Sequence, residues 1–162
     1  MEKQQIADLF MRGQDCSQVV IENYADSLGV GEEELNRITS AFGGGIGVGE
    51  VCGAVIGAMV VIGMKYGHKG PDDMDQRNIM MAKRAEFLEK WAKLHSELSC
   101  RDLLGYDFSQ PGEFERAIGD GVLFTRCPDF VTDAISVLDE VIASDEASGS
   151  EGDTASENSS AS

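Results

Sequence analysis

The longest apolar segment of the chain constrains its fold more than any other feature. Residues 51–64 read VCGAVIGAMVVIGM, without a single charge, between Glu50 and Lys65. A membrane-spanning helix needs about 20 apolar residues, so this segment is too short to cross a bilayer. A helix that is apolar on every side must instead be covered by other elements. We therefore expect a buried central helix over 50–66, with the rest of the domain packed around it.

Glycine and proline divide the remaining chain into further helices. Apolar residues at helical spacing predict them at 3–11, 16–28, 32–42, 73–98, 100–104 and 128–143. Asp15 is predicted to cap the N-terminus of the 16–28 helix. The buried stripe of the 73–98 helix is predicted at Met81, Ala85, Leu88, Ala92, His95 and Leu98. Residues 106–126 are expected to be mostly loop, with one helical turn. Because no segment alternates apolar and polar residues, the predicted fold class is all-α. The expected architecture is a compact multi-helix array with a Gly-rich loop before the central buried helix.

The composition changes at Ser144. Residues 144–162 contain five acidic residues but no aromatic, branched aliphatic or basic one. Such a segment cannot bury enough apolar surface to offset the entropy lost on ordering. We therefore predict a single helical redox-type domain over 1–143, followed by a disordered acidic tail over 144–162.

The net charge restricts the partners of the chain. The formal net charge is −16, of which −11 remains on residues 1–143. A field of this sign repels phosphates, so we predict neither nucleic-acid binding nor membrane insertion. The N-terminus lacks the basic start and continuous apolar stretch of a signal peptide. A cytoplasmic location is expected, where permanent disulfides are rare.

The four cysteines share one local pattern. Each lies in the first turn or at the cap of a predicted helix, with apolar residues three and four positions later: Cys16, Cys52, Cys100 and Cys127. These positions share one helix face, so every sulfur is predicted to point into the core. Helix N-termini favour thiolates, but four buried thiolates repel one another. If the sulfurs converge, either a cation neutralises them or they pair as disulfides; ordinary buried thiols are the alternative.

The sequence around these cysteines resembles a known family. Residues 42–67 read FGGGIGVGEVCGAVIGAMVVIGMKYG, and the other cysteines lie in GQDCSQVV, SCRDLLG and RCPDFV. Over about 5–142 the chain is similar to the redox-active family named for one Cys, a CGAxxG motif and two further Cys. A related domain occurs in split-Soret cytochromes, where an iron–sulfur centre accompanies the haems. The chain has no C-x-x-C-H, so haem attachment is not implied.

Three functions are compatible with this pattern. In the preferred one, Cys16, Cys52, Cys100 and Cys127 ligate an iron–sulfur cluster, with [2Fe–2S] favoured, in an electron-transfer protein. In the second, the same cysteines form redox disulfides and Cys52 is the catalytic nucleophile. In the third, they hold a structural zinc ion in a non-catalytic protein. Whether the chain is an enzyme stays open. A redox partner protein is expected, and the small residues of the central helix allow a homodimer.

Other candidate residues receive more modest roles. Gly53 and Gly57 are predicted to allow close helix–helix contact, with shaping of a cofactor site as the second interpretation. The glycine run at 43–49 fits no phosphate-binding motif, because Glu50 replaces the required Lys or final Gly. We expect it to approach Cys52 closely and to direct backbone N–H groups at whatever Cys52 binds. His95 is expected to be a core histidine rather than a spare ligand or a hydrogen-bond partner of one.

Overall fold

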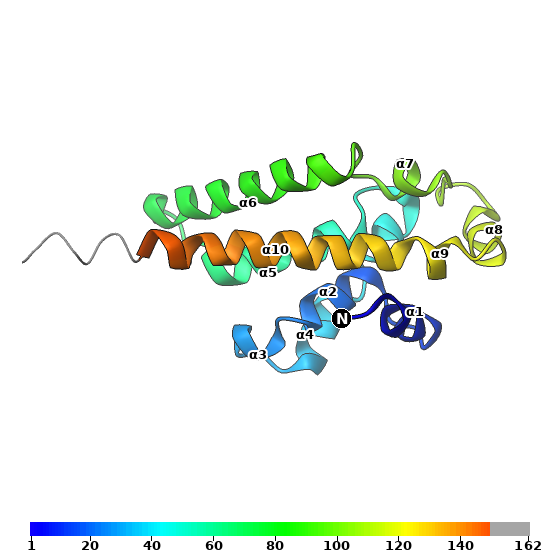
Figure 1. The fold of residues 1–162 in the computed structure, drawn as a ribbon, viewed down its shortest axis with the longest axis horizontal. Helices are drawn as coiled ribbons and strands as arrows, with labels where there is room; N and C mark the ends of the chain where they lie inside the picture. The colour runs from blue at the N-terminus through cyan, green and yellow to red at the C-terminus, as the bar shows by residue number, and fades with distance from the viewer. Residues whose placement is uncertain (150–162) are drawn as a thin grey trace, which may run out of the picture.

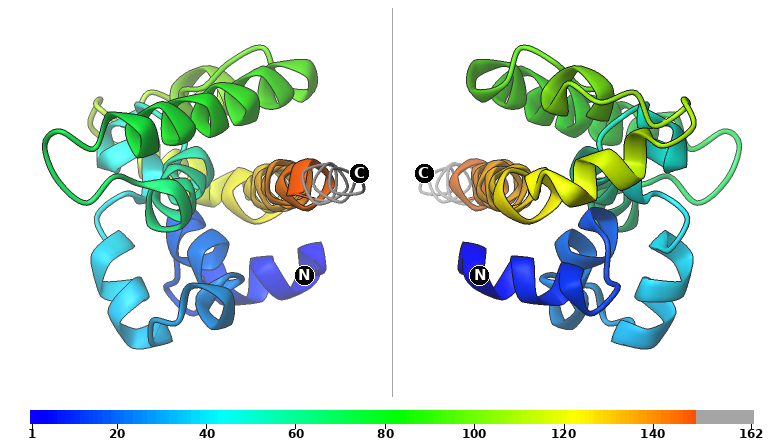
Figure 2. Two further views of the ribbon diagram at one scale, coloured as in Figure 1. Left: turned by 90° about the vertical axis from the view of Figure 1, so that its left-hand side faces the viewer. Right: turned by 90° about the vertical axis from the view of Figure 1, so that its right-hand side faces the viewer.

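The apolar segment forms the central helix α5 (Gly53–Tyr66) of the computed structural model, which describes residues 1–149. The long helix α10 (Cys127–Gly149) runs beside it in a middle layer, and α6 (Met74–Leu94) covers one side of this layer (Figures 1 and 2). The other side is covered by α1 (Lys3–Met11), α2 (Cys16–Glu22), α3 (Ala25–Leu28) and α4 (Glu32–Thr39). Short helices lie at one end: α7 (Cys100–Leu104), α8 (Glu113–Gly119) and α9 (Val122–Thr125). The all-α prediction is confirmed, since the described residues contain no strand beyond one isolated bridge.

The contacts of α6 differ from the predicted stripe. Phe87 and Trp91 are its fully buried side chains, whereas Met81 and Leu98 of the predicted stripe are exposed. The prediction assumed one straight helix through Leu98, but α6 ends at Leu94 and the chain turns away. Trp91 instead fixes this turn, because its indole N–H donates to the Glu97 carbonyl oxygen at 3.0 Å. The buried face is therefore set by the two largest aromatic side chains of the helix.

Two further segments also differ from expectation. The predicted 16–28 helix is interrupted after Glu22 and resumes as α3. Residues 106–126, expected to be mostly loop, contain the two helices α8 and α9. Gly112 and Gly121 have positive φ and precede these helices, so the glycines begin helices here instead of interrupting one.

Helix α10 continues beyond its predicted end at Ala143, through Gly149. Lys83 of α6 anchors this extension by donating to the Val141 carbonyl oxygen and the Ser144 hydroxyl, and by pairing with Asp145 at 2.5 Å. Residues 150–162, most of the predicted tail, lie outside the described residues, so their predicted disorder stays a prediction. Within residues 1–149, no helix combines the length and apolar character that crossing a membrane requires.

Helices α2 and α5 approach each other closely at Gly57. A methyl group placed there would lie 2.9 Å from the Ser17 carbonyl oxygen and 3.0 Å from Val20 Cβ. Ala54 and Ala58 on the same helix are fully buried. The small residues of α5 thus serve contact within the chain, which is the role first predicted for Gly57.

Substituting Gly57 by alanine should lower the free energy of unfolding by about 1–3 kcal/mol, because the methyl group must displace the α2 backbone. Gly63→Ala is the matched control in the same helix, since a methyl group at Gly63 meets no atom within 4 Å. That variant should gain up to about 1 kcal/mol from helix propensity. Urea unfolding measures both, and equal effects of the two substitutions would contradict the proposed close approach.

Candidate functional site

A single antiparallel bridge places Cys52 beside Cys100. Val51 and Ser99 form the bridge, in which the Cys52 N–H donates to the Leu98 carbonyl oxygen at 2.8 Å. The Cys100 N–H donates in turn to the Glu50 carbonyl oxygen at 2.7 Å. Helices α5 and α7 begin directly after this bridge, so Cys52 and Cys100 lie at the starts of helices, as predicted. Their side chains are hydrogen-bonded to each other.

Cys16 and Cys127 form a second hydrogen-bonded pair. Cys16 is the first residue of α2, which Asp15 caps by accepting from the Ser17 and Gln18 N–H groups, as the sequence predicted. Cys127 is the first residue of α10. The preceding Arg126 donates to the Leu103 and Leu104 carbonyl oxygens at 2.6 and 3.3 Å. This contact holds the start of α10 against the end of α7, the helix that begins at Cys100.

The two pairs belong to one buried cluster. All four cysteines are free and buried, and Cys16 interacts electrostatically with each of the other three. Gly53 brings the pairs together, because a methyl group at this position would lie 3.2 Å from Cys16 Cβ and from the Phe42 carbonyl oxygen. Gly53 and Gly57 therefore have contact roles, and neither lines the cavity described below. The prediction that every sulfur enters the core is confirmed by these burials.

The environment divides the thiols by acidity. The pKa of Cys52 is lowered, chiefly because the Cys100 thiol donates to its sulfur and also because the Ala54 and Val55 N–H groups do so. The same hydrogen bond and burial raise the pKa of Cys100. The pKa of Cys16 is raised well above the usual range by the hydrogen bond between Cys16 and Cys127 and by burial. Helix N-termini were expected to favour thiolates generally, but for Cys16 and Cys100 burial and the neighbouring sulfurs outweigh that effect.

The glycine run forms a left-handed turn beside the cysteines. Every residue from Gly44 to Gly47 has positive φ, including Ile46 at 58°. Isoleucine strongly disfavours this conformation, because its branched Cβ crowds the backbone. Arg101 of α7 fixes the end of the turn by donating to the Val48 carbonyl oxygen at 3.4 Å and pairing with Glu50 at 3.3 Å. A methyl group at Gly53 would lie 3.4 Å from Gly43 Cα, so the run approaches the start of α5 beside Cys52, as expected. The N–H groups that act on the Cys52 sulfur are those of Ala54 and Val55 and not those of the run.

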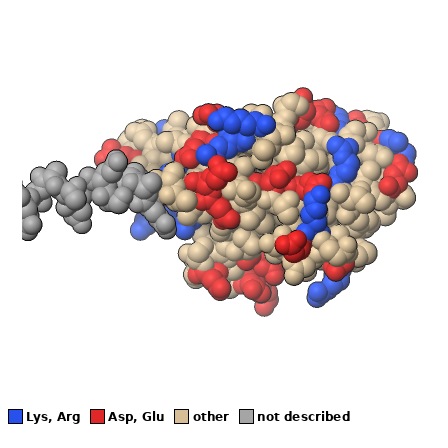
Figure 3. All heavy atoms as spheres, viewed as in Figure 1, with Lys and Arg blue, Asp and Glu red and all other residues tan. Residues whose placement is uncertain are grey.

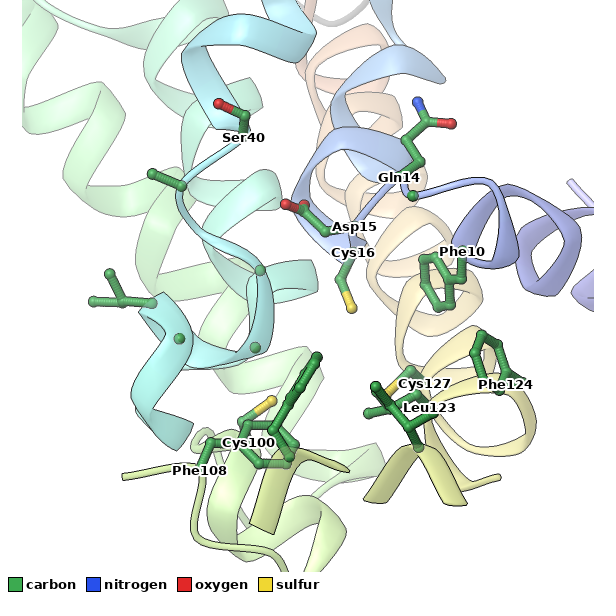
Figure 4. Close-up of a pocket in the computed structure, with 18 residues that line it drawn as sticks. Phe10, Gln14, Asp15, Cys16, Ser40, Cys100, Phe108, Leu123, Phe124 and Cys127 are labelled. Atoms are coloured by element: carbon green, nitrogen blue, oxygen red, sulfur yellow. The ribbon is translucent and has the colours of Figure 1, made fainter. Parts of the chain in front are cut away.

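A cavity of about 570 Å³ opens onto three of the cysteines. The sulfurs of Cys16, Cys100 and Cys127 point into the space between the surrounding helices (Figure 4). Its walls include phenylalanine side chains from several elements: Phe10, Phe108, Phe114 and Phe124. Sequence reasoning missed these residues, because scattered phenylalanines in short helices give no signal of a shared cavity. Cys52 does not line the cavity and is only 1% exposed.

His95 lies beside the cluster without joining it. Its Nε2 is 2.8 Å from Asp133 Oδ2, and its ring packs 4.5 Å from Trp91 and 5.2 Å from Phe130, centroid to centroid. His95 therefore lies at the edge of the core with Asp133 as its hydrogen-bond partner, which is close to the predicted core histidine. Among residues 1–149, no three His, Cys, Asp or Glu side chains are grouped in a way that could hold a metal ion.

This fold and site define an all-helical protein whose distinctive feature is a buried cluster of four cysteines. The family described as "putative redox-active protein (C_GCAxxG_C_C)" matches residues 14–141. The chain belongs to this family, which supports a redox role. The family name writes its motif GCAxxG, whereas this chain has Cys52 before Gly53. No curated protein and no solved structure gives a significant match.

In the reduced, metal-free protein, Cys52 should lose its proton before Cys16 and Cys100 as the pH rises. Its pKa is expected below that of a free cysteine, because three donors stabilise the thiolate. Thiolate absorbance in the ultraviolet follows the titration. Cys52→Ala should remove the first step of the titration. Cys100→Ala should raise the pKa of Cys52, because it removes the strongest hydrogen-bond donor to the Cys52 sulfur. A first step that persists in Cys52→Ala would contradict this assignment.

Proposed function

We propose that the chain is an electron-transfer protein whose four cysteines hold an iron–sulfur cluster, with [2Fe–2S] favoured. The observation that supports this most directly is the grouping of the thiols into two hydrogen-bonded pairs within one buried cluster. Thiolate sulfur is the donor that such clusters require, and four cysteines are the usual complement. The chemistry of the donor set therefore fits the group, although no three of these thiols within residues 1–149 are already grouped closely enough to hold one metal ion.

The pairing favours a cluster with two metal ions over a single zinc ion. Two sulfurs bound to one tetrahedral ion at about 2.3 Å lie about 3.8 Å apart. A single ion needs that spacing between all four sulfurs. Here Cys16 interacts most strongly with Cys127 and Cys52 with Cys100, and no three of the cysteines within residues 1–149 are grouped as one ion requires. Each pair would hold one iron of a two-iron cluster.

The chain's own groups prepare these ligands. Cysteine binds metal as thiolate, and Cys52, with its lowered pKa, is closer to that state than Cys16 or Cys100. The N–H groups of Ala54 and Val55 stabilise negative charge on its sulfur and would tune a bound cluster. Burial leaves at most 8% of the surface of each cysteine exposed. When bound, the cluster supplies reversible one-electron transfer, and a redox partner must then exist.

Anaerobic purification or reconstitution tests the proposal. We expect a coloured protein with about two iron and two sulfide ions per chain. Gly53→Ala should reduce the iron content, because its methyl group pushes Cys16 away from α5. Gly63→Ala, which meets no neighbouring atom, should retain it. Colourless protein without iron, or protein with one zinc ion per chain, would refute the iron–sulfur assignment.

A thiol–disulfide function is the second candidate, and the lowered pKa of Cys52 favours it. In this reaction the Cys52 thiolate attacks the disulfide of an oxidised partner and releases one partner thiol. Cys100 then attacks the mixed disulfide, which forms the Cys52–Cys100 disulfide and releases the second partner thiol. Two thiols of this chain are oxidised and one partner disulfide is reduced.

Oxidation of the metal-free protein by a small disulfide such as oxidised glutathione tests this second function. Peptide mass mapping should find Cys52 joined to Cys100 and Cys16 joined to Cys127, because these are the hydrogen-bonded pairs. Cys52→Ala should leave Cys16 and Cys127 able to pair. Mixed pairings, or cysteines that stay reduced, would argue against a thiol–disulfide function and leave the cluster proposal untouched.

A further inference from the structure

We infer that the cavity beside the cysteines binds a small, uncharged aromatic molecule. Its volume of about 570 Å³ lies within the range of about 300–1,000 Å³ that is typical of small-molecule sites. That this molecule is the redox partner of the site rests on the proposed function. Binding of the molecule does not rest on it, because the apolar walls of the cavity are side chains of this chain.

The walls favour a flat apolar ring. Phe10 comes from α1, Phe108 from the segment after α7, Phe114 from α8 and Phe124 from α9. The rings of Phe108 and Phe114 meet edge to face, with centroids 5.3 Å apart. Aromatic rings pack favourably in such edge-to-face and offset-stacked arrangements. Side chains that point at the same space from separate elements form a built pocket and not a flat apolar surface (Figure 4).

The charges around the cavity exclude an anionic ligand. Its lining contains no basic side chain, and its one acidic residue is Asp15. The Asp15 carboxylate already accepts hydrogen bonds from the Ser17 N–H, the Ser17 hydroxyl and the Gln18 N–H. Acidic side chains also spread over the molecular surface, as one face shows (Figure 3), in keeping with the net charge of −16. A carboxylate or phosphate group would thus meet the negative charge of Asp15 with no basic side chain in the lining to pair with.

Ile46 provides an independent argument. It is 54% exposed and lines the cavity in a left-handed conformation that glycine or asparagine would adopt more readily. An exposed, strained isoleucine stabilises neither the turn nor the core. Strained residues of this kind cluster at ligand sites. Its apolar side chain at the cavity is instead suited to contact with an apolar ligand.

The position of the cavity links this ligand to the cysteines. Cys16, Cys100 and Cys127 form part of the lining, so a bound ring would lie against three of the four sulfurs. Cys52, which is outside the lining, would remain shielded. An uncharged aromatic molecule can therefore reach the cysteines through this cavity, whereas an anion is disfavoured there.

Fluorescence titration of the full chain with two matched probes tests the inference. N-phenyl-1-naphthylamine is uncharged, and 8-anilinonaphthalene-1-sulfonate has the same rings with a sulfonate added. The uncharged probe should bind with enhanced emission, and the sulfonate at least about tenfold more weakly because no cation in the lining pairs with it. Displacement of the probe by phenyltrimethylammonium but not by its neutral isostere tert-butylbenzene would overturn the uncharged character of the ligand.

Substitutions locate the probe. Ile118→Arg should weaken binding about tenfold, because Ile118 lines the cavity and is 42% exposed. Ile79→Arg is the matched control, since Ile79 is 47% exposed on α6, away from the cavity. Ile46→Asn should weaken binding without lowering Tm, because asparagine tolerates the left-handed conformation. Circular dichroism verifies that each variant is folded.

The two proposals fail separately. The titrations are run on the protein as isolated and again after removal of metal and reduction of the cysteines. Probe binding that Ile118→Arg abolishes, in a chain that never takes up iron, supports the cavity and refutes the cluster. A chain that holds iron but binds neither probe, or binds the probe equally well in Ile118→Arg and Ile79→Arg, refutes the inferred ligand site.

Discussion

The close approach of α5 to α2 is the constraint on which the rest of the structure depends. Gly53 and Gly57 leave no room for a side chain, and they face Cys16 and the Ser17–Val20 turn respectively. This contact sets the distance between the first cysteine and the start of α5, where Cys52 stands. The motif Cys52-Gly53-Ala54-Val55-Ile56-Gly57 therefore has a structural explanation. Its cysteine supplies a sulfur, and its two glycines bring that sulfur to the partner helix.

Burying four thiols together has an electrostatic consequence. Hydrogen bonding, burial and the neighbouring sulfurs raise the pKa of Cys16 and Cys100, whereas the hydrogen bond from Cys100 lowers the pKa of Cys52. Such opposed shifts within one small volume are typical of functional sites. A fold that needed only a stable core would place apolar side chains at these positions. Membership of a redox-active family agrees with this interpretation.

Much of this arrangement could be predicted from local sequence, and the remainder depends on tertiary contacts. The spacing of apolar residues after each cysteine correctly predicted burial of the sulfurs, and Asp15 was correctly identified as a cap. The Val51–Ser99 bridge left no sequence signal, because one residue pair cannot show alternation. The predicted buried stripe of α6 was wrong at Met81, because Phe87 and Trp91 occupy the buried face instead, and at Leu98, because the helix ends at Leu94. The cavity was missed because its phenylalanines come from separate short elements.

The Val51–Ser99 bridge also holds two of the cysteines in position through main-chain hydrogen bonds. The amides of Cys52 and Cys100 are held by main-chain acceptors at 2.8 and 2.7 Å, so their register does not depend on any bond between sulfurs. Small zinc domains, in contrast, gain their fold only when the metal binds. This chain is preorganised by its backbone. The starts of α5 and α7 are thus held in place by main-chain bonds alone, and a change in the chemical state of the thiols does not by itself release them.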